Sequence, residues 1–201
     1  MIGIIDYSIN NIGSVINAVK FLNIDYEVVT DPAKLPDFKM LILPGVGSFD
    51  SGVTALQNSG MFDGLQNLDL TSTKLFGICL GMQLLCSSSE EGTLQGLDLV
   101  KGKVVHLKNK SCDGKIPHIG FNTIQSSDSH IFLESMLGDD FYFVHSYAFN
   151  ADCEKIKIAT CNYSGASITA ALQYGSIFGS QFHPEKSGLK GLELIRRAYT
   201  C

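Results

Sequence analysis

The sequence predicts an α/β fold: an open, mostly parallel sheet flanked by helices, with antiparallel and mixed strands added in the C-terminal half. Two patterns predict this arrangement. Short apolar strands alternate with helical periodicity in the first half, whereas after residue 92 strand patterns follow one another without intervening helices. The 201 residues are 45% hydrophobic and 17% charged, which is typical of a globular chain. We therefore expect a single domain over residues 1–201.

The first half alternates strands and helices in chain order. Ile2–Ile5 is a continuous apolar run, as in a parallel strand that is buried on both faces. Apolar residues then recur at helical spacing over residues 12–22, with Asn11 placed to cap the helix. Strands are expected at residues 25–29 and 40–43, and a further helix around residues 53–57. This βαβ order predicts a parallel sheet covered by helices.

The second half reads as a series of strands. Polar or glycine-containing turns separate strands expected at residues 103–107, 116–123, 141–147, 157–159, 169–173 and 177–182. Residues 174–177 read as a hairpin turn, and residues 108–115 as an exposed, mobile loop. A last helix is expected over residues 188–199, with Leu192, Ile195 and Tyr199 on one face.

Charge and cysteine content exclude several classes of protein. The net charge of −5 and the lack of a basic run argue against a nucleic-acid partner. The N-terminus does not resemble a signal peptide, and no apolar run approaches the ~20 residues that cross a bilayer, so we expect no membrane partner and a cytoplasmic location. The six cysteines show neither CxxC pairs nor a disulfide framework and are expected to be reduced, with Cys201 an incidental exposed thiol.

The sequence also argues against a bound cofactor or metal. The first strand-to-helix turn, residues 6–11, lacks the glycine fingerprint of a dinucleotide site. No two cysteine or histidine residues show the spacing of zinc ligands. We expect neither a cofactor nor a metal site.

Cys79 lies where an apolar strand, residues 75–78, passes into a helix-favouring segment, residues 80–85. Gly77 and Gly81 flank it at the spacing of a nucleophile elbow, whose sharp turn needs residues without a Cβ atom. Such a turn exposes the sulfur at a helix N-terminus, which favours the thiolate, and places the N–H of Leu80 to bind an oxyanion. Taken alone, the stretch also fits a buried core cysteine.

A second glycine-containing segment, Pro-Gly-Val-Gly at residues 44–47, follows the third strand. Open α/β sheets place their ligands at this end of their strands. The glycines allow the backbone to approach a ligand, and a peptide that is free to reorient would supply a second oxyanion donor. A plain turn is the alternative reading of these residues.

A nucleophilic cysteine needs a base, and the base needs an orienting acceptor. His183 is the strongest candidate among the five histidines because it ends the strand at 177–182 and Glu185 follows two residues later. Side chains two residues apart at the end of a strand point the same way, so Glu185 can hold the second ring nitrogen. The other histidines are assigned to the strand interior, His118 and His145, or to solvent, His106 and His130.

Three motifs occur in order and together resemble those of class I (triad) glutamine amidotransferases. They are Pro-Gly-Val-Gly at 44–47, Gly-Ile-Cys-Leu-Gly-Met-Gln at 77–83 and Gln-Phe-His-Pro-Glu at 181–185. Within that family the chain is similar, nearly end to end, to the glutaminase subunits of imidazole glycerol phosphate synthases. Further similar segments lie at residues 96–104, 117–120, 142–147 and 182–188. The resemblance implies a flavodoxin-like sheet.

The resemblance implies a role for each matching residue. Cys79 would be the nucleophile, His183 the acid and base, and Glu185 the orienting carboxylate. The N–H of Leu80 and a loop amide at Val46 would form the oxyanion hole. Four further residues would hold glutamine: Gly47, Gln83, Ser146 and Tyr147. Glutamine would be hydrolysed through a γ-glutamyl thioester.

In the family, the ammonia passes to a (β/α)8-barrel cyclase subunit, which forms a heterodimer with the glutaminase and works in histidine biosynthesis. Phe121, Lys186 and Asn11 would face that partner. The chain departs from the family at the turn of residues 6–11, which usually contains glycine, and at Phe121, where tryptophan is usual. These departures leave open a paralogous subunit that supplies ammonia for amidation of a surface-polysaccharide sugar. A cysteine on an elbow also leaves open a second alternative, a DJ-1-like or peptidase-like cysteine hydrolase.

Overall fold

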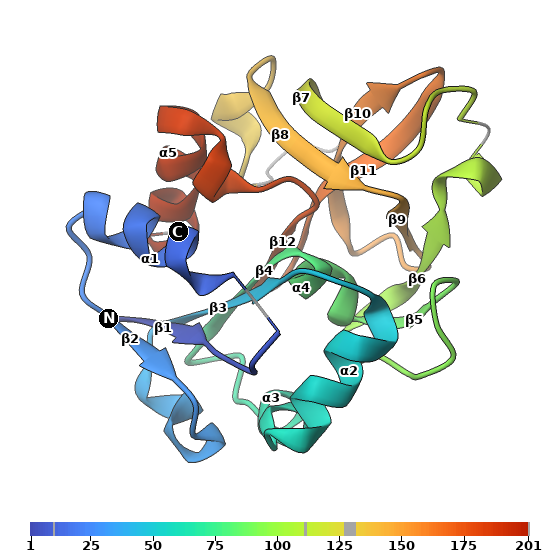
Figure 1. The fold of residues 1–201 in the computed structure, drawn as a ribbon. Coiled ribbons are helices and arrows are strands. Elements are labelled where there is room, and N and C mark those ends of the chain that lie inside the picture. Colours follow the sequence, from blue (N-terminus) through green and yellow to red (C-terminus); the bar gives the residue numbers. More distant parts are fainter. Residues whose placement is uncertain (10, 111, 127–131, 201) are drawn as a thin grey trace.

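The computed structural model describes residues 1–9, 11–110, 112–126 and 132–200 (Figure 1). Within them lies a main sheet of strands β1 (Ile2–Ile5), β2 (Tyr26–Val29), β3 (Met40–Gly45), β4 (Lys74–Cys79), β7 (His118–Ser126), β8 (Asp140–His145), β10 (Lys157–Tyr163), β11 (Ala166–Tyr174) and β12 (Ile177–Ser180). A smaller sheet contains β5 (Cys86–Ser89), β6 (Val100–His106) and β9 (Tyr147–Ala151). The α-helices are α1 (Ile12–Phe21), α2 (Phe49–Asn58), α3 (Met61–Gln66), α4 (Leu80–Leu84) and α5 (Gly188–Thr200).

The main sheet has a parallel half and an antiparallel half. Strands run in the order β2-β1-β3-β4-β12-β11-β10-β7-β8, and all pairings from β2 to β12 are parallel. From β12 to β8 every pairing is antiparallel. The β2-β1-β3-β4 order is that of flavodoxin-like sheets. The predicted fold class, a mostly parallel core with antiparallel strands added by the second half, is confirmed.

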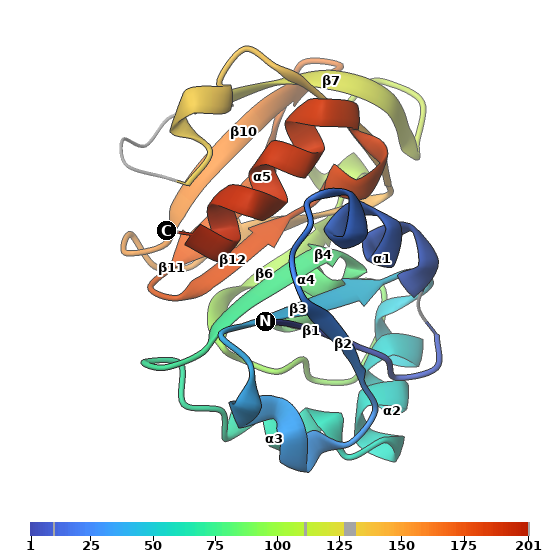
Figure 2. The ribbon, with the colours of Figure 1, turned by 90° about the vertical axis from the view of Figure 1, so that its left-hand side faces the viewer.

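Helices cover both faces of the parallel half (Figures 1 and 2). Apolar side chains of α1 and α5 pack with Ile2, Ile4 and Ile42 on one face. Those of α2, α3 and α4 pack with Leu41 and Leu43 on the other. The alternation of side chains along a strand divides each apolar run between the two layers. The continuous apolar strands of the sequence are therefore buried on both sides, as predicted.

The expected strand at residues 141–147 is instead two strands in different sheets. β8 pairs with β7 at the edge of the main sheet, whereas β9 pairs with β6 in the smaller sheet. Only Ser146 separates them. The smaller sheet also contains β5, whose Cys-Ser-Ser-Ser sequence has no apolar alternation and did not predict a strand. Pairing with distant segments, which a local pattern does not encode, accounts for both differences.

Two other local expectations need correction. Asn11 occupies the N-cap position of α1, but its side chain makes no capping hydrogen bond within the described residues. The expected loop at residues 108–115 begins as the 3₁₀ turn Leu107–Lys110, and Cys112 within it is buried with its sulfur toward the carbonyl of Tyr163. His106 is half-buried against the ring of Tyr147 and does not simply face solvent.

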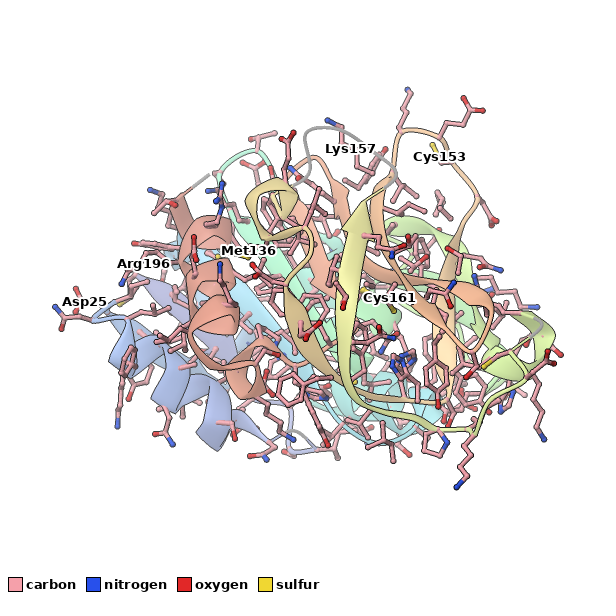
Figure 3. All side chains as sticks on the ribbon, turned by 90° about the horizontal axis from the view of Figure 1, so that it is seen from above. Asp25, Met136, Cys153, Lys157, Cys161 and Arg196 are labelled. Carbon is pink, nitrogen blue, oxygen red and sulfur yellow. The ribbon has the colours of Figure 1, made fainter. Side chains whose placement is uncertain are left out.

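The described cysteines are all free thiols in contrasting environments. Figure 3 shows Cys153 on a peripheral loop and Cys161 among the side chains of the interior. Burial raises the pKa of the Cys161 thiol to about 12 and also raises that of Cys86. His130 and Cys201, assigned above to solvent, lie outside the described residues. No helix in the described ranges has the length and apolar character needed to span a membrane.

Candidate active site

Cys79 lies at the junction of β4 and α4 with φ +54° and ψ −110°. A non-glycine residue with positive φ is strained, and such strain concentrates at functional sites. Glycines on both sides make the turn sterically feasible: a Cβ at Gly81 would lie 1.8 Å from the carbonyl oxygen of Leu43, and one at Gly77 would lie 2.7 Å from the backbone nitrogen of Met82. The structure therefore has the sharp strand-to-helix corner that the glycine spacing predicts.

His183 and Glu185 form a buried pair beside Cys79. Nδ1 of His183 lies 2.7 Å from Oε1 of Glu185, and each side chain is 5% exposed. Glu185 does not extend from the strand as expected, because β12 ends at Ser180 and Glu185 belongs to the 3₁₀ turn Pro184–Lys186. The turn brings the carboxylate back to the imidazole, so the predicted contact exists on a different local structure.

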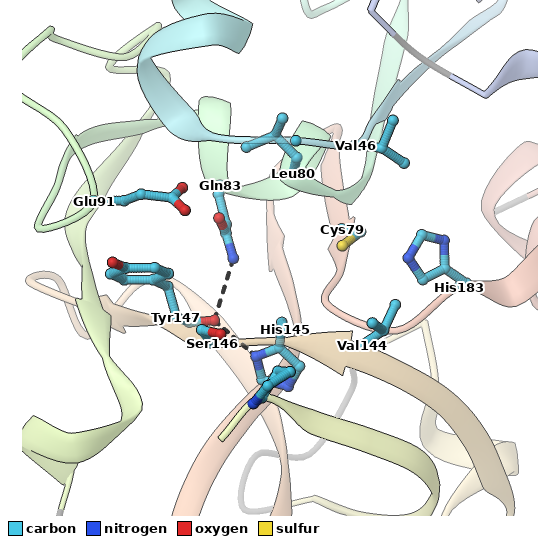
Figure 4. A pocket seen from close by; sticks show the side chains of 12 residues that line it. Val46, Cys79, Leu80, Gln83, Glu91, Val144, His145, Ser146, Tyr147 and His183 are labelled. Carbon is cyan, nitrogen blue, oxygen red and sulfur yellow. Dashed lines mark hydrogen bonds between the residues drawn. The ribbon is translucent and has the colours of Figure 1, made fainter. Parts of the chain in front are cut away.

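The other side of the imidazole faces Cys79, whose sulfur lies across the pocket from it in Figure 4. Burial by itself lowers the pKa of His183, but hydrogen bonds to Cys79 and Glu185 and the negative charges of these groups outweigh it and raise the pKa to about 9. An imidazolium between two acceptors is the form that these contacts stabilise. The arrangement suits a thiolate and imidazolium pair near neutral pH.

A cavity of about 410 Å³ opens over the sulfur. It is lined by Val46, Gly47, Cys79, Leu80, Gln83, Glu91, Pro117, Val144, His145, Ser146, Tyr147 and His183 (Figure 4). The structure thus gathers in one cavity all the sequence-predicted nucleophile, base, oxyanion and glutamine-binding residues. Glu185 lies behind His183 and lines a smaller neighbouring cavity instead.

The loop after β3 and the start of α4 form one side of this cavity, and the junction of β8 and β9 forms the other. Val46 and Gly47 follow β3, and Gly47 has a φ of +102°, a conformation that suits glycine. Leu80 begins α4 directly after the nucleophile. Ser146 and Tyr147 lie opposite, at the junction of β8 and β9, where the carbonyl of Tyr147 accepts a hydrogen bond of 3.2 Å from Nε2 of Gln83.

Sequence reasoning missed Glu91 as a lining residue. Its Oε2 accepts a hydrogen bond of 2.8 Å from the backbone nitrogen of Phe49, the first residue of α2, and its carboxylate lines the cavity. The helix N-terminus stabilises a negative charge at this place. Forty-two positions separate the two residues, so no local signal in the sequence pointed to the contact.

The three predicted interface residues lie on two neighbouring surfaces. Asn11 and Lys186 are exposed and line the smaller cavity with Val46, His183 and Glu185. Phe121 lies on β7, is 63% exposed, and packs against the ring of Tyr142, whose backbone nitrogen donates to the hydroxyl of Ser187 beside Lys186. Phe121 therefore lies near the active-site side of the molecule without lining the cavity over Cys79.

The fold and this site define a class of protein. Residues 3–199 match the family "Glutamine amidotransferase class-I", and the chain belongs to that family. Solved structures agree at the level of the fold: a glutamine amidotransferase superposes with a TM-score of 0.75 over 98% of both chains at 19% identity. PurLQS from Thermotoga maritima gives 0.76 over 99% of this chain and 97% of that one at 17% identity.

Comparison with individual curated proteins narrows the similarity to one kind of subunit within this family. The chain is 42% identical to "Imidazole glycerol phosphate synthase subunit HisH 2" of Methanococcus maripaludis, over 97% of this chain and 96% of the relative. It is 40% identical to "Imidazole glycerol phosphate synthase subunit HisH" of Leptospira borgpetersenii, over 98% of both. The Chlorobium chlorochromatii subunit of that name is 41% identical over 97% of both chains.

Proposed function

We propose that this chain is the glutaminase subunit of an imidazole glycerol phosphate synthase, acting as a single domain that hydrolyses glutamine to glutamate and ammonia. The main support is a cavity in which Cys79, on a strained turn, faces the imidazole of His183. Nδ1 of this imidazole lies 2.7 Å from Oε1 of Glu185. Near-full-length identity of about 40% to HisH subunits supports the same assignment. Membership of the amidotransferase family favours it over a DJ-1-like or peptidase-like hydrolase.

In the proposed reaction, the Cys79 thiolate attacks the side-chain amide carbon of glutamine, and a C–S bond forms. Backbone N–H groups of Leu80 and at Val46 stabilise the oxyanion. The C–N bond breaks as the His183 imidazolium gives its proton to the leaving nitrogen, which departs as ammonia. His183 then takes a proton from water, whose oxygen attacks the thioester. The C–S bond breaks, which releases glutamate and regenerates the thiolate beside the imidazolium.

Both walls of the cavity supply groups that hold the substrate. We assign glutamine binding to four of the lining residues: Gly47, Gln83, Ser146 and Tyr147. Glu91 joins them as the carboxylate that faces the α-ammonium group of glutamine, because opposite charges attract strongly in a partly enclosed site. The substrate is thus held at both ends, with its amide over the sulfur.

We propose that the ammonia passes to a cyclase subunit, a (β/α)8 barrel, that forms a heterodimer with this chain. The exposed apolar residues Phe121 and Ile119 on β7, 63% and 58% exposed, and the neighbouring Lys186 supply the docking surface. Such exposed apolar side chains rimmed by polar groups are typical of protein interfaces. The complete enzyme is a lyase of histidine biosynthesis. The free thiols of the described cysteines suit the reducing cytoplasm, where we place the reaction.

The test measures product formation by the complex with a cyclase subunit, with either glutamine or ammonium as nitrogen source. Cys79→Ala should abolish glutamine-dependent formation and spare ammonium-dependent formation. Cys153→Ala, a half-buried cysteine on a peripheral loop, is the matched control and should change neither. Glutamine-dependent turnover by Cys79→Ala would refute the assignment. Ammonia transfer to a sugar acceptor, but not to the cyclase, would support the paralogous subunit.

A further inference from the structure

The sulfur of Cys79 has a second polar neighbour besides His183. Nε2 of Gln181 lies 3.8 Å from Sγ, within hydrogen-bonding reach of sulfur. Gln181 is fully buried, and its backbone nitrogen donates to the carbonyl of Ala170 at 2.8 Å, which anchors the residue to the sheet. The mechanism above gives Gln181 no role, although it contacts the reacting atom.

The orientation of the Gln181 amide follows from its partners. Its Oε1 lies 2.9 Å from Nε2 of Gln83, and that nitrogen also donates to the carbonyl oxygen of Tyr147 at 3.2 Å. A carbonyl oxygen only accepts, so Gln83 must present its nitrogen to Tyr147 and to Gln181. Gln181 must then present its oxygen to Gln83, which leaves its N–H for the sulfur.

The Tyr147 carbonyl is held from its other side by a histidine pair. Nδ1 of His145 donates to it at 2.7 Å, so Nε2 of His145 is the acceptor for Nδ1 of His118 at 3.0 Å (Figure 4 shows the first contact). Nδ2 of Asn122 donates to Nε2 of His118 at 3.4 Å and ends this series of hydrogen bonds. Burial lowers the pKa of His145 to about 3 and that of His118 to about 4, so both rings stay neutral and keep these tautomers at neutral pH.

We propose that Gln181 is a further catalytic residue, whose side-chain N–H is directed by Gln83 and the Tyr147 carbonyl to the sulfur of Cys79 and stabilises it as a thiolate. The inference rests on the proposed function, in which Cys79 is the nucleophile. A hydrogen bond to an ionised acceptor is stronger than one to a neutral acceptor, so the contact favours the thiolate over the thiol. Gln83 is a positioning residue here in addition to its place in the cavity.

Other titratable groups also lie near Cys79. His183, His145 and Glu91 line the cavity over its sulfur. Tyr7 on the β1 side stays neutral, because burial and the charge of Cys79 raise its pKa, and its hydroxyl donates to the carbonyl of Pro44 at 2.8 Å. Gln181 contacts the sulfur directly, so the effect of a change there can be read in the titration of Cys79.

The experiment follows the alkylation of Cys79 by iodoacetamide against pH, with the modified peptide quantified by mass spectrometry. Gln181→Met keeps the bulk of the side chain and removes the donor. The midpoint of the Cys79 titration should rise by about one pH unit, and alkylation at pH 7 should slow about tenfold. Gln181→Glu places a carboxylate beside the sulfur and should raise the midpoint further.

Gln173→Met is the matched control, because the side-chain oxygen of Gln173 also accepts an internal hydrogen bond, from the backbone nitrogen of Phe132 at 3.0 Å. Its profile should match that of the unmodified protein. If Gln181→Met does not fold, Gln83→Met releases the Gln181 amide and should still raise the midpoint. An unchanged midpoint in the folded variant overturns the inference while leaving the proposed function intact. Glutamine hydrolysis by Cys79→Ala would instead overturn the proposed function, and this inference with it.

Discussion

Glu185 binds His183 through one carboxylate oxygen, whereas the other is buried without a hydrogen-bond partner among the described residues. Oε1 of Glu185 lies 2.7 Å from Nδ1 of His183, and Oε2 is the oxygen without a partner. Breaking such a buried pair would leave an uncompensated group in the interior, so each partner depends on the other. Burial lowers the pKa of His183, but the hydrogen bonds and charges of Cys79 and Glu185 outweigh it and raise that pKa to about 9.

Glu185→Gln should separate the charge of this residue from its shape. The amide keeps an oxygen for Nδ1 but loses the negative charge, so the pKa of His183 should fall below about 9. Glutamine-dependent kcat should fall roughly 100-fold or more, as expected when an orienting carboxylate is lost. The pH profile of kcat/KM checks this: its basic limb should move to lower pH. Glu193→Gln, on the exposed surface of α5, should leave the limb in place.

The His118 and His145 pair should make the protein sensitive to acid. Both pKa values are lowered in the fold, to about 4 and about 3, so below pH 6.5 the unfolded chain binds more protons than the folded one. The free energy of unfolding should therefore fall as pH drops from about 6.5 toward 3. Urea unfolding at several pH values measures this. His118→Phe, which keeps the stacking on Tyr163, should show a shallower slope, and an unchanged slope would contradict the account.

Gly81→Ala should prevent the elbow from forming. The new Cβ would lie 1.8 Å from the carbonyl oxygen of Leu43, so α4 would have to move off β3. We expect a loss of stability of several kcal/mol, about the upper range for single substitutions, or no soluble protein. Gly13→Ala is the control within α1, where the Cβ would make an ordinary contact of 3.8 Å with Asn11. Thermal unfolding should show this variant to be as stable or more stable.

Glu91→Gln should weaken glutamine binding more than catalysis. The amide oxygen can still accept the hydrogen bond from the Phe49 nitrogen, so the start of α2 is preserved. Loss of the charge that faces the substrate ammonium should raise KM for glutamine about tenfold and change kcat less. Steady-state kinetics in the complex measures both constants. An equal fall in kcat with an unchanged KM would place the role of Glu91 elsewhere.

Phe121→Ser should leave the free subunit intact and weaken the complex. The side chain is 63% exposed, so its removal should not lower the melting temperature. If it anchors the cyclase, affinity should drop about tenfold or more, the range of an aromatic interface anchor. Titration calorimetry with the cyclase subunit gives the affinity. Phe21→Ser removes a comparably exposed ring, 70% exposed at the end of α1, and should bind the cyclase normally.

Local pattern was enough for the parts of the site that depend on close sequence neighbours. Gly77 and Gly81 predicted the elbow at Cys79 because the turn itself needs them, and the His183 and Glu185 contact spans two positions. The parallel half of the sheet was equally predictable, since strands buried on both faces leave long apolar runs.

Long-range contacts account for what the sequence did not predict. The amide of Gln181 meets Gln83 and Cys79 across 98 and 102 positions, so its orientation depends on the assembled sheet. Residues 141–147 contain no glycine or proline to mark a break at Ser146, where the pairing partner changes from β7 to β6. The partner of a strand, unlike its propensity, is a property of the whole fold.

The junction at Ser146 makes the length of the chain there more critical than its composition. Side chains alternate along a strand, so one inserted residue after His145 would turn the whole of β9 over relative to its pairing with β6. Tyr147 would leave the cavity, and its carbonyl would no longer meet Gln83. Substitutions at Ser146 change one wall of the cavity, whereas an insertion or a deletion would remove the wall altogether. The connection between the two sheets at Ser146 thus tolerates a change of side chain but not a change of length.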